Sequence, residues 1–267
     1  MADWGIKSDG YKTSQQNVLI TCHASANTKG SWAQVIASTA FTGYVSVAYT
    51  GLALNYAYAV DIGIGEAGSE VVIAANLIFE WTGTYGIATN YFDIPILLPV
   101  GTRVAVRGQC TAGGQVAIIS VNHTAVSGFT RQPLFSAVDT YGFTAADSGG
   151  TAVDPGSTAN TAGAWAQFSA ACTATYRAII VAASVGSDQI RSDAYFYVEV
   201  GVGAAGSEII LVKHALRSHT AADYILPAYS NLIPVSIPAG TRIAVRLTCN
   251  INTDGDRLAD VVLHFFR

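Results

Sequence analysis

The stretch at residues 61–73, "DIGIGEAGSEVVI", decides the fold of this chain because it returns at residues 199–211 as "EVGVGAAGSEIIL". Two further stretches return in the same order. "ASANTKGSWAQ" at 24–34 matches "GSTANTAGAWAQ" at 156–167, and "LPVGTRVAVRGQC" at 98–110 matches "IPAGTRIAVRLTC" at 237–249. The sequence is therefore an internal duplication of one fold.

The spacing of the matches indicates that the repeated unit is a whole domain. Gln34 and Gln167 lie 133 residues apart, and the other two matches have offsets of 138 and 139 residues. Such a small drift fits insertions in loops. The period is far longer than the roughly 20 to 50 residues of a solenoid repeat, so each half needs its own core. We predict two tandem domains, residues 1–127 and 128–267.

Each half has an all-β pattern. Short runs rich in β-branched and aromatic residues are separated by Gly, Pro, Asn and Thr, and no window shows a helical apolar period with helix caps. The expected strands lie at 44–51, 56–65, 70–79, 92–99, 102–110 and 114–123, and at 176–184, 193–203, 207–216, 231–240, 241–249 and 259–267. Strands at this spacing are typical of antiparallel β-sandwiches.

The glycines at 63, 65 and 68 have the Gly-x-Gly-x-x-Gly spacing of a dinucleotide-binding loop. That loop must open a helix, whose free N–H groups bind the pyrophosphate. Here another strand is expected directly afterwards, and the same spacing recurs in the second half. We therefore interpret the glycines as sites where a large side chain or another backbone lies close to the strand, followed by a hairpin turn.

The composition excludes several classes of function. The 267 residues are 51% hydrophobic and 12% charged, with a formal net charge of -4. The basic residues are scattered, which argues against nucleic-acid binding. No apolar run reaches the roughly 18 to 20 residues that span a bilayer, and no secretory signal is visible. We expect synthesis in a cytoplasm and no membrane insertion.

The four cysteines, Cys22, Cys110, Cys172 and Cys249, are widely separated and form no Cys-x-x-Cys pair. This spacing offers neither a zinc knuckle nor a redox motif. We expect them to be buried as small apolar residues. The alternative is one disulfide in each half, Cys22 with Cys110 and Cys172 with Cys249.

Motifs that would carry catalysis or bind a metal are weak. Among the five histidines only His214 and His219 are close in sequence, and their separation puts them on opposite faces of a strand. Loop carboxylates could bind Ca²⁺, although "NTDGD" at 252–256 is also an ordinary turn sequence. The candidate ligands are Asp188, Asp193, Asp254 and Asp256. We predict no catalytic, cofactor-binding or metal-binding residues, and the ligand or interface residues stay unknown.

Several polar and aromatic residues are kept in both halves. Arg103 and Arg107, which return as Arg242 and Arg246, share one strand face and could clamp a carboxylate or phosphate, or simply line a solvated or interfacial face. Glu70 and Glu208 are identical acids at a turn. Asp61 becomes Glu199, which favours an exposed position. Trp32 and Trp165 are expected to pack in the core or on a sheet.

At "VGVGAAGSE" and "IPAGTRIAVR" the chain resembles phage-encoded virion surface proteins built from tandem jelly-roll-like β-sandwiches. The resemblance covers about residues 32–107 and 165–246. It implies a non-enzymatic structural protein of a bacteriophage virion, a head (capsid) decoration or a tail- or neck-associated protein, with no catalytic residues to carry over. The variable stretch 124–163 and the N-terminal region are where attachment to neighbours is expected to differ.

The resemblance also implies a homo-oligomer, with a trimer favoured, that contacts other virion proteins. The low charge of the sequence agrees with this expectation, because the cores of protein interfaces are poor in charge and rich in aromatic residues. An alternative is a carbohydrate-binding or host-receptor adhesin module that holds a surface glycan. Its exposed aromatic residues would be Tyr85, Tyr91, Tyr224 or Tyr229. A third possibility, a polysaccharide-degrading enzyme, would need two suitably spaced carboxylates.

Overall fold

The computed structural model describes residues 13–51, 56–81, 91–125, 135–146, 148–184, 194–217, 228–251 and 258–267. These ranges are all-β, with nineteen strands. The strands are β1 (Thr13–Thr21), β2 (Ala33–Ile36), β3 (Gly43–Gly51), β4 (Tyr56–Ile64), β5 (Val71–Trp81), β6 (Tyr91–Leu98), β7 (Val104–Cys110), β8 (Val116–Ala125), β9 (Val138–Tyr141), β10 (Phe143–Thr144), β11 (Gly149–Val153), β12 (Ala166–Ser169), β13 (Tyr176–Ser184), β14 (Tyr195–Val202), β15 (Ile209–Arg217), β16 (Ala228–Tyr229), β17 (Ile233–Ile237), β18 (Ile243–Cys249) and β19 (Ala259–Phe266). No helix in this part of the chain is long and apolar enough to cross a membrane.

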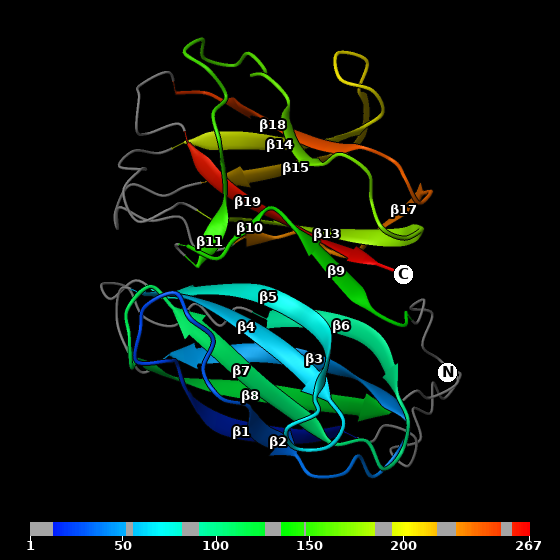
Figure 1. The fold of residues 1–267 in the computed structure, drawn as a ribbon. Helices are drawn as coiled ribbons and strands as arrows, with labels where there is room; N and C mark the ends of the chain where they lie inside the picture. Colours follow the sequence, from blue (N-terminus) through cyan, green and yellow to red (C-terminus); the bar gives the residue numbers. More distant parts are fainter. Residues whose placement is uncertain are drawn as a thin grey trace, which may run out of the picture.

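Two antiparallel sandwiches are stacked along the chain (Figure 1). The first has sheets with strand orders β1-β8-β3-β6 and β2-β7-β4-β5. The second has a four-stranded sheet, β12-β18-β14-β15, and a seven-stranded sheet built on β10-β11-β19-β13-β16, with β17 on β13 and β9 on β19. Strand orders of this kind are those of a jelly roll, two Greek keys closed face to face. The predicted tandem jelly-roll-like fold is confirmed.

The two sandwiches repeat in register as well as in topology. Asp61 lies opposite Arg107 in the β4–β7 pair, and Glu199 lies opposite Arg246 in the β14–β18 pair. The same irregularity interrupts β2 after Gln34 and β12 after the matching glutamine. The boundary predicted between residues 127 and 128 falls within 126–134, which lies outside the described residues.

Strands β13 and β19 of the seven-stranded sheet are buried on both faces over most of their length, because their side chains alternate between two cores. On β13 and β19, Ile179, Val181, Leu263 and Phe265 belong to the core of the second sandwich. Their neighbours point the opposite way and join residues of the first sandwich; these are Ala178, Ile180 and Phe266 in one cluster, and Ala182 and Val262 with Ile78 in another. The sheet is thus a layer shared by both halves.

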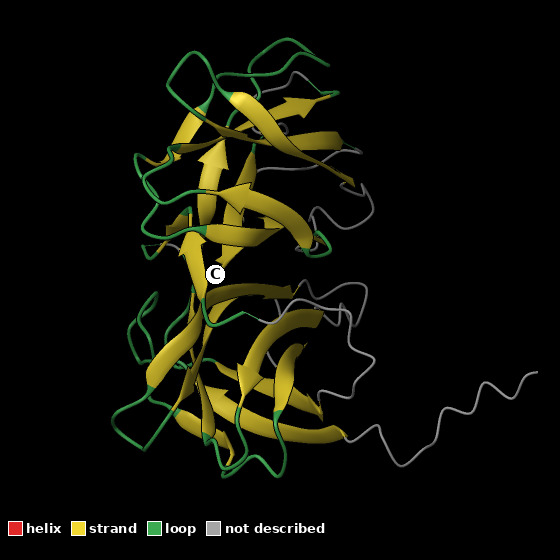
Figure 2. Ribbon diagram, turned by 90° about the vertical axis from the view of Figure 1, so that its right-hand side faces the viewer, coloured by secondary structure: helices red, strands yellow, loops and turns green. Residues whose placement is uncertain are grey.

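The first sandwich meets this shared sheet along its β5 and β6 edge (Figure 1). Figure 2 shows the two stacked sandwiches from the side. Thr140 of β9 donates a hydrogen bond to the Ala75 carbonyl at 2.7 Å. The ring of Phe92 on β6 packs edge-on against Tyr229 and His264 at 5.2 and 5.0 Å between centroids. The two sandwiches therefore pack directly against each other through both polar and apolar contacts.

The matching face of the first sandwich is polar. By strand register, Ala178, Ile180 and Ala182 correspond to Tyr44, Ser46 and Ala48, and Val262, His264 and Phe266 correspond to Ser120, Asn122 and Thr124. The duplication has therefore diverged at this face. The outer face is apolar on β13 and β19, where the other sandwich covers it, and polar on β3 and β8. The contact between sandwiches therefore does not repeat on the β3 and β8 face of the first sandwich.

Candidate functional site

The turn between β4 and β5 is braced by one arginine. Arg103 donates from Nε to Gln34 Oε1 at 2.9 Å, and from Nη1 to the Gly65 carbonyl at 2.9 Å and to Glu70 Oε1 at 3.0 Å. The second oxygen of Glu70 accepts the Gly68 N–H at 3.0 Å. Gly65 and Gly68 have φ values of 108° and 84°, which only glycine adopts readily. The turn is thus fixed in shape.

The second sandwich has the same brace. Arg242 donates to Gln167 Oε1 at 2.9 Å, to the Gly203 carbonyl at 3.3 Å and to Glu208 Oε1 at 2.7 Å. Loss of hydration alone would raise the pKa of Glu208, but the hydrogen bond and charge of Arg242, together with hydrogen bonds from backbone N–H groups, outweigh it and hold the pKa below its usual value. Arg103 and Arg242 therefore hold carboxylates that belong to the chain itself.

The repeated tryptophans pack on the first glycine of each motif. A Cβ on Gly63 would lie 2.8 Å from the Trp32 ring, and one on Gly201 would lie 2.6 Å from the Trp165 ring. The guanidinium of Arg107 covers Trp32 at 4.5 Å from the ring centroid, and that of Arg246 covers Trp165 at the same distance. The glycine interpretation and the sheet-packing prediction for both tryptophans are confirmed.

The prediction that Asp61 and Glu199 are exposed is wrong, since they are only 3% and 4% exposed. Asp61 pairs with Lys29 at 2.8 Å and Arg107 at 2.9 Å, and Glu199 pairs with Lys213 at 3.0 Å and Arg246 at 2.6 Å. Burial would raise the pKa of Glu199, but the two cations outweigh it and lower the pKa. The exchange of Asp for Glu therefore keeps a carboxylate paired with two cations in both sandwiches.

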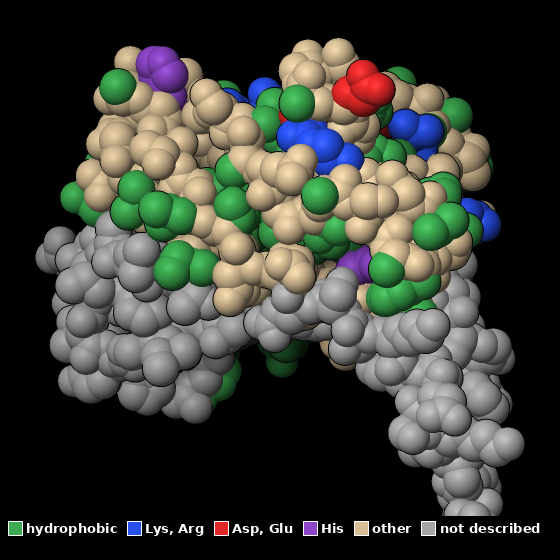
Figure 3. Space-filling view, turned by 90° about the horizontal axis from the view of Figure 1, so that it is seen from below, with side chains coloured by type: hydrophobic (Ala, Val, Ile, Leu, Met, Phe, Trp, Pro, Cys, Tyr) green, Lys and Arg blue, Asp and Glu red, His purple; other side chains and the backbone are tan. Residues whose placement is uncertain are grey.

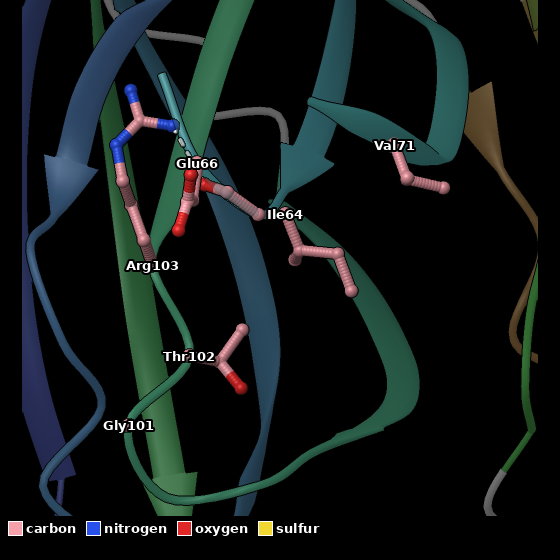
Figure 4. A pocket seen from close by; sticks show the side chains of 7 residues that line it. Ile64, Glu66, Val71, Gly101, Thr102 and Arg103 are labelled. Atoms are coloured by element: carbon pink, nitrogen blue, oxygen red, sulfur yellow. Dashed lines mark hydrogen bonds between the residues drawn. The ribbon is translucent and has the colours of Figure 1, made fainter. Parts of the chain in front are cut away.

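Each braced turn ends in an exposed apolar pair. Val71 and Val72 are 64% and 40% exposed, and Ile209 and Ile210 are 71% and 44% exposed. We call the two pairs the turn tips. Beside the first pair lies an open depression of about 480 Å³, lined among others by Ile64, Val71, Thr102 and Arg103 (Figure 4). Its walls are mainly apolar side chains and the backbone of two turns, so it offers a packing surface.

The other predicted candidates are dispersed. No group of three or more His, Cys, Asp or Glu side chains is placed to hold a metal within the described ranges. The calcium candidates Asp188, Asp193, Asp254 and Asp256 lie outside those ranges, as does His219. The four cysteines are buried and unbridged, as the favoured interpretation predicted.

The predicted glycan-stacking tyrosines do not form a surface in the part of the chain that is described. Tyr85 and Tyr224 lie outside it, and the side chain of Tyr91 is not described either. Tyr229 was expected to be exposed, and this is wrong, because its ring is partly buried against Phe92 at the junction of the sandwiches.

Sequence reasoning missed an exposed tyrosine pair, Tyr195 and Tyr197 on β14, which are 50% and 44% exposed. The alternation "YFYVEV" carries the signal, because Phe196 and Val198 are fully buried and period two then turns both tyrosines outward.

No protein-family model matches the chain, and no curated protein matches it. Among solved structures it is similar to two crystal forms of PNGF-II, at TM-scores of 0.43 and 0.44 and 8% and 9% identity. These matches cover 97% of this chain and 66% of the other, so the chain spans just under two thirds of their length. It is also similar to the N-terminal CBM22-1-CBM22-2 tandem domain of Paenibacillus barcinonensis Xyn10C, at a TM-score of 0.28 and 8% identity, over 97% and 93% of the two chains. Similarities of this size carry no information on activity.

Proposed function

We propose that this chain is a non-enzymatic structural protein of a bacteriophage virion, a head decoration or a tail- or neck-associated protein, that assembles through its turn tips. The proposal takes the virion from the sequence resemblance. It takes the assembly surface from the repeated exposure of Val71 with Val72 and of Ile209 with Ile210. The assembled state is proposed to be a homo-oligomer, with a trimer favoured, docked on other virion proteins.

The repeated turn tips carry the proposal. Leaving β-branched side chains in water forgoes about 1.5 to 3 kcal/mol for each side chain that burial would gain. The chain does this at the same position in both sandwiches, next to turns that are fixed by arginine braces. A rigid, repeated apolar contact suits a partner surface, because little entropy is lost when it is covered.

The rest of the surface fits assembly better than catalysis. Figure 3 shows a face on which uncharged side chains and backbone predominate, with few Lys, Arg, Asp or Glu side chains. The repeated carboxylates each pair with one or two cations of the chain itself. Groups held in this way are poorly suited to give and take protons, so the constellation supports a structural role.

Native mass by size exclusion with light scattering tests the proposal, at several concentrations and with added chelator. The wild-type chain should form one closed oligomer that is indifferent to chelator. A variant with Val71, Val72, Ile209 and Ile210 all changed to Ser should shift to monomer. Leu19→Ser, an equally exposed apolar residue away from the tips, serves as the control and should leave the mass unchanged. A wild-type monomer at every concentration, or an oligomer that survives the tip variant, would overturn the proposal.

A further inference from the structure

The two sandwiches also differ at a second equivalent place, the end of β4 or β14 that lies far from the braced turn. In the first sandwich this part of the outer face carries Ala57 and Ala59, and residues 143–146 and Ser148 lie beside it. Gln109 Nε2 donates to the Ala145 carbonyl at 3.2 Å and to Ser148 Oγ at 3.0 Å. Asn27 donates to the Ala146 carbonyl. This position is therefore a binding place, and the chain itself occupies it.

In the second sandwich the same place carries aromatic side chains. Tyr195 and Tyr197 stand 138 residues after Ala57 and Ala59, at the same register against the neighbouring strand. Both point outward and are about half exposed. Thr248 takes the place of Gln109, and Asn160 takes the place of Asn27 with the same left-handed backbone, φ 59° against 55°. The second sandwich therefore carries two exposed tyrosines where the first carries two alanines beside another segment of the chain. We call the exposed tyrosines, together with the neighbouring Lys213, the platform.

The platform is surrounded by small and polar side chains. Tyr197 lies opposite Ala215 on one side and Thr248 on the other, so its ring stands above its cross-strand neighbours. Lys213 Nζ lies 4.6 Å from the ring centroid of Tyr197 and 3.0 Å from Glu199. Because Glu199 is shared with Arg246, the two cations and one carboxylate leave a local charge of about +1.

From this comparison we infer that the platform formed by Tyr195, Tyr197 and Lys213 binds a saccharide that bears a carboxylate. A sugar ring presents an apolar face of C–H groups that stacks on an aromatic ring, and its hydroxyls need polar partners around that ring. Lys213 supplies a charge-assisted donor for the acidic group. The nearby polar residues are Thr248, which lies opposite Tyr197 on the neighbouring strand, and Asn160, whose N–H donates to the Cys249 carbonyl beside it. The site is separate from the turn tips, so it stands or fails independently of the proposed assembly.

The size and polarity of the platform favour a saccharide over a protein partner. A stable protein contact buries about 800 Å² on each side around an apolar centre. The platform offers two tyrosines among small and charged residues, and the exposed apolar pair of the same sheet, Ile209 and Ile210, lies at the opposite end of β14. A compact, hydroxylated ligand matches this footprint.

An array of neutral and carboxylate-bearing oligosaccharides, followed by calorimetric titration of the best-bound member, tests the inference with the full chain. Wild-type protein should bind carboxylate-bearing members saturably. Tyr195→Ala with Tyr197→Ala should weaken binding at least tenfold, whereas Tyr195→Phe with Tyr197→Phe should retain most of it. Lys213→Ala should weaken binding to acidic members more than to neutral ones.

Two further comparisons make the outcome decisive. Ile209→Ser with Ile210→Ser changes equal apolar exposure on the same sheet and should leave saccharide binding unchanged, even if it alters native mass. Thermal unfolding should stay close to the wild type in the tyrosine and isoleucine variants, whose changed side chains are 44% to 71% exposed. Lys213→Ala also removes one of the two cations that pair with Glu199, so a small loss of stability is expected there. No array signal from wild-type protein, or binding that survives the alanine pair, would overturn the site.

Discussion

At the scale of single residues, the buried carboxylates Asp61 and Glu199 differ in how much they hold together. Asp61 pairs with Lys29 and Arg107 and also accepts the N–H of Asn76 at 2.9 Å, which fixes the left-handed backbone of that residue. Glu199 pairs with Arg246 and with Lys213, whose side chain is 51% exposed. When the acid is removed, the cations that remain in the first sandwich are less well solvated than those that remain in the second.

We therefore expect Asp61→Asn to lower the free energy of unfolding by about 2 to 3 kcal/mol and Glu199→Gln by about 1 kcal/mol, because exposed pairs are screened by water. Urea unfolding at pH 7 measures both. Equal losses would show that the two acids have the same role in stability, contrary to this account.

His264 couples the stability of the junction to pH. The side chain is fully buried between the sandwiches, 3.1 Å from Thr140 Oγ1 and edge-on to Phe92, and burial lowers its pKa to about 3. The folded protein keeps the ring neutral, whereas the unfolded chain takes up a proton below a pKa of about 6.5. This contribution to stability is complete above about pH 6.5 and is lost as the pH falls toward 3.

The wild-type chain should lose about 3 kcal/mol from this residue between pH 7.5 and pH 4.5. His264→Asn places the residue that occupies the matching position of the first sandwich, and it removes this term. Unfolding free energies of both proteins at the two pH values test the expectation. An equally steep loss in the variant would assign the acid sensitivity to other groups.

At the scale of elements, the paired sequence motifs carry most of the predictable structure. The strands predicted from β-branched runs correspond to β3–β8, β13–β15 and β17–β19. Strands β1, β2, β9–β12 and β16 were missed, because "TSQQNVLIT" is polar and the others are two to five residues long. Their pairing partners, which lie far away in the chain, decide their conformation.

The candidate site was only partly predictable for a similar reason. The alternation of side chains along a strand predicted that Arg103 and Arg107 share one face. The glycine spacing predicted that a large side chain lies close to the strand. Neither pattern reveals which acid lies across the sheet, so Asp61 was taken for an exposed residue although two cations from other segments bury it. Contacts between distant strands carry that information.

Close packing of tryptophan on the glycine strand gives an element-scale prediction. Gly63→Ala would place a methyl group 2.8 Å from Trp32, so we expect a loss of about 1 to 3 kcal/mol of unfolding free energy. Gly68→Asn, in the same motif, meets no atom within 4 Å and keeps a residue that tolerates positive φ, so it should cost far less. Thermal unfolding compares the two. A larger loss at Gly68 would contradict the packing interpretation.

At the scale of the whole molecule, one surface of the sandwiches joins the two halves and another is proposed to contact partners. The apolar outer face of the β13–β19 layer joins the halves, and its polar counterpart around Ser120 and Asn122 does not repeat that contact. Strands β9, β10 and β11, which lie in the stretch expected to contact neighbours, belong to the same seven-stranded sheet. The turn tips then remain as the repeated apolar surfaces available to partners.

Hydrogen–deuterium exchange, measured below and above the concentration at which the chain assembles, tests this division most directly. The account predicts that β13 and β19 exchange slowly at both concentrations, because both faces of their sheet are covered. Amides around residues 65–72 and 203–210 should become protected only in the assembled state. Exchange at the turn tips that is independent of concentration, or exchange in β13 and β19 as fast as in the edge strands, would contradict the account.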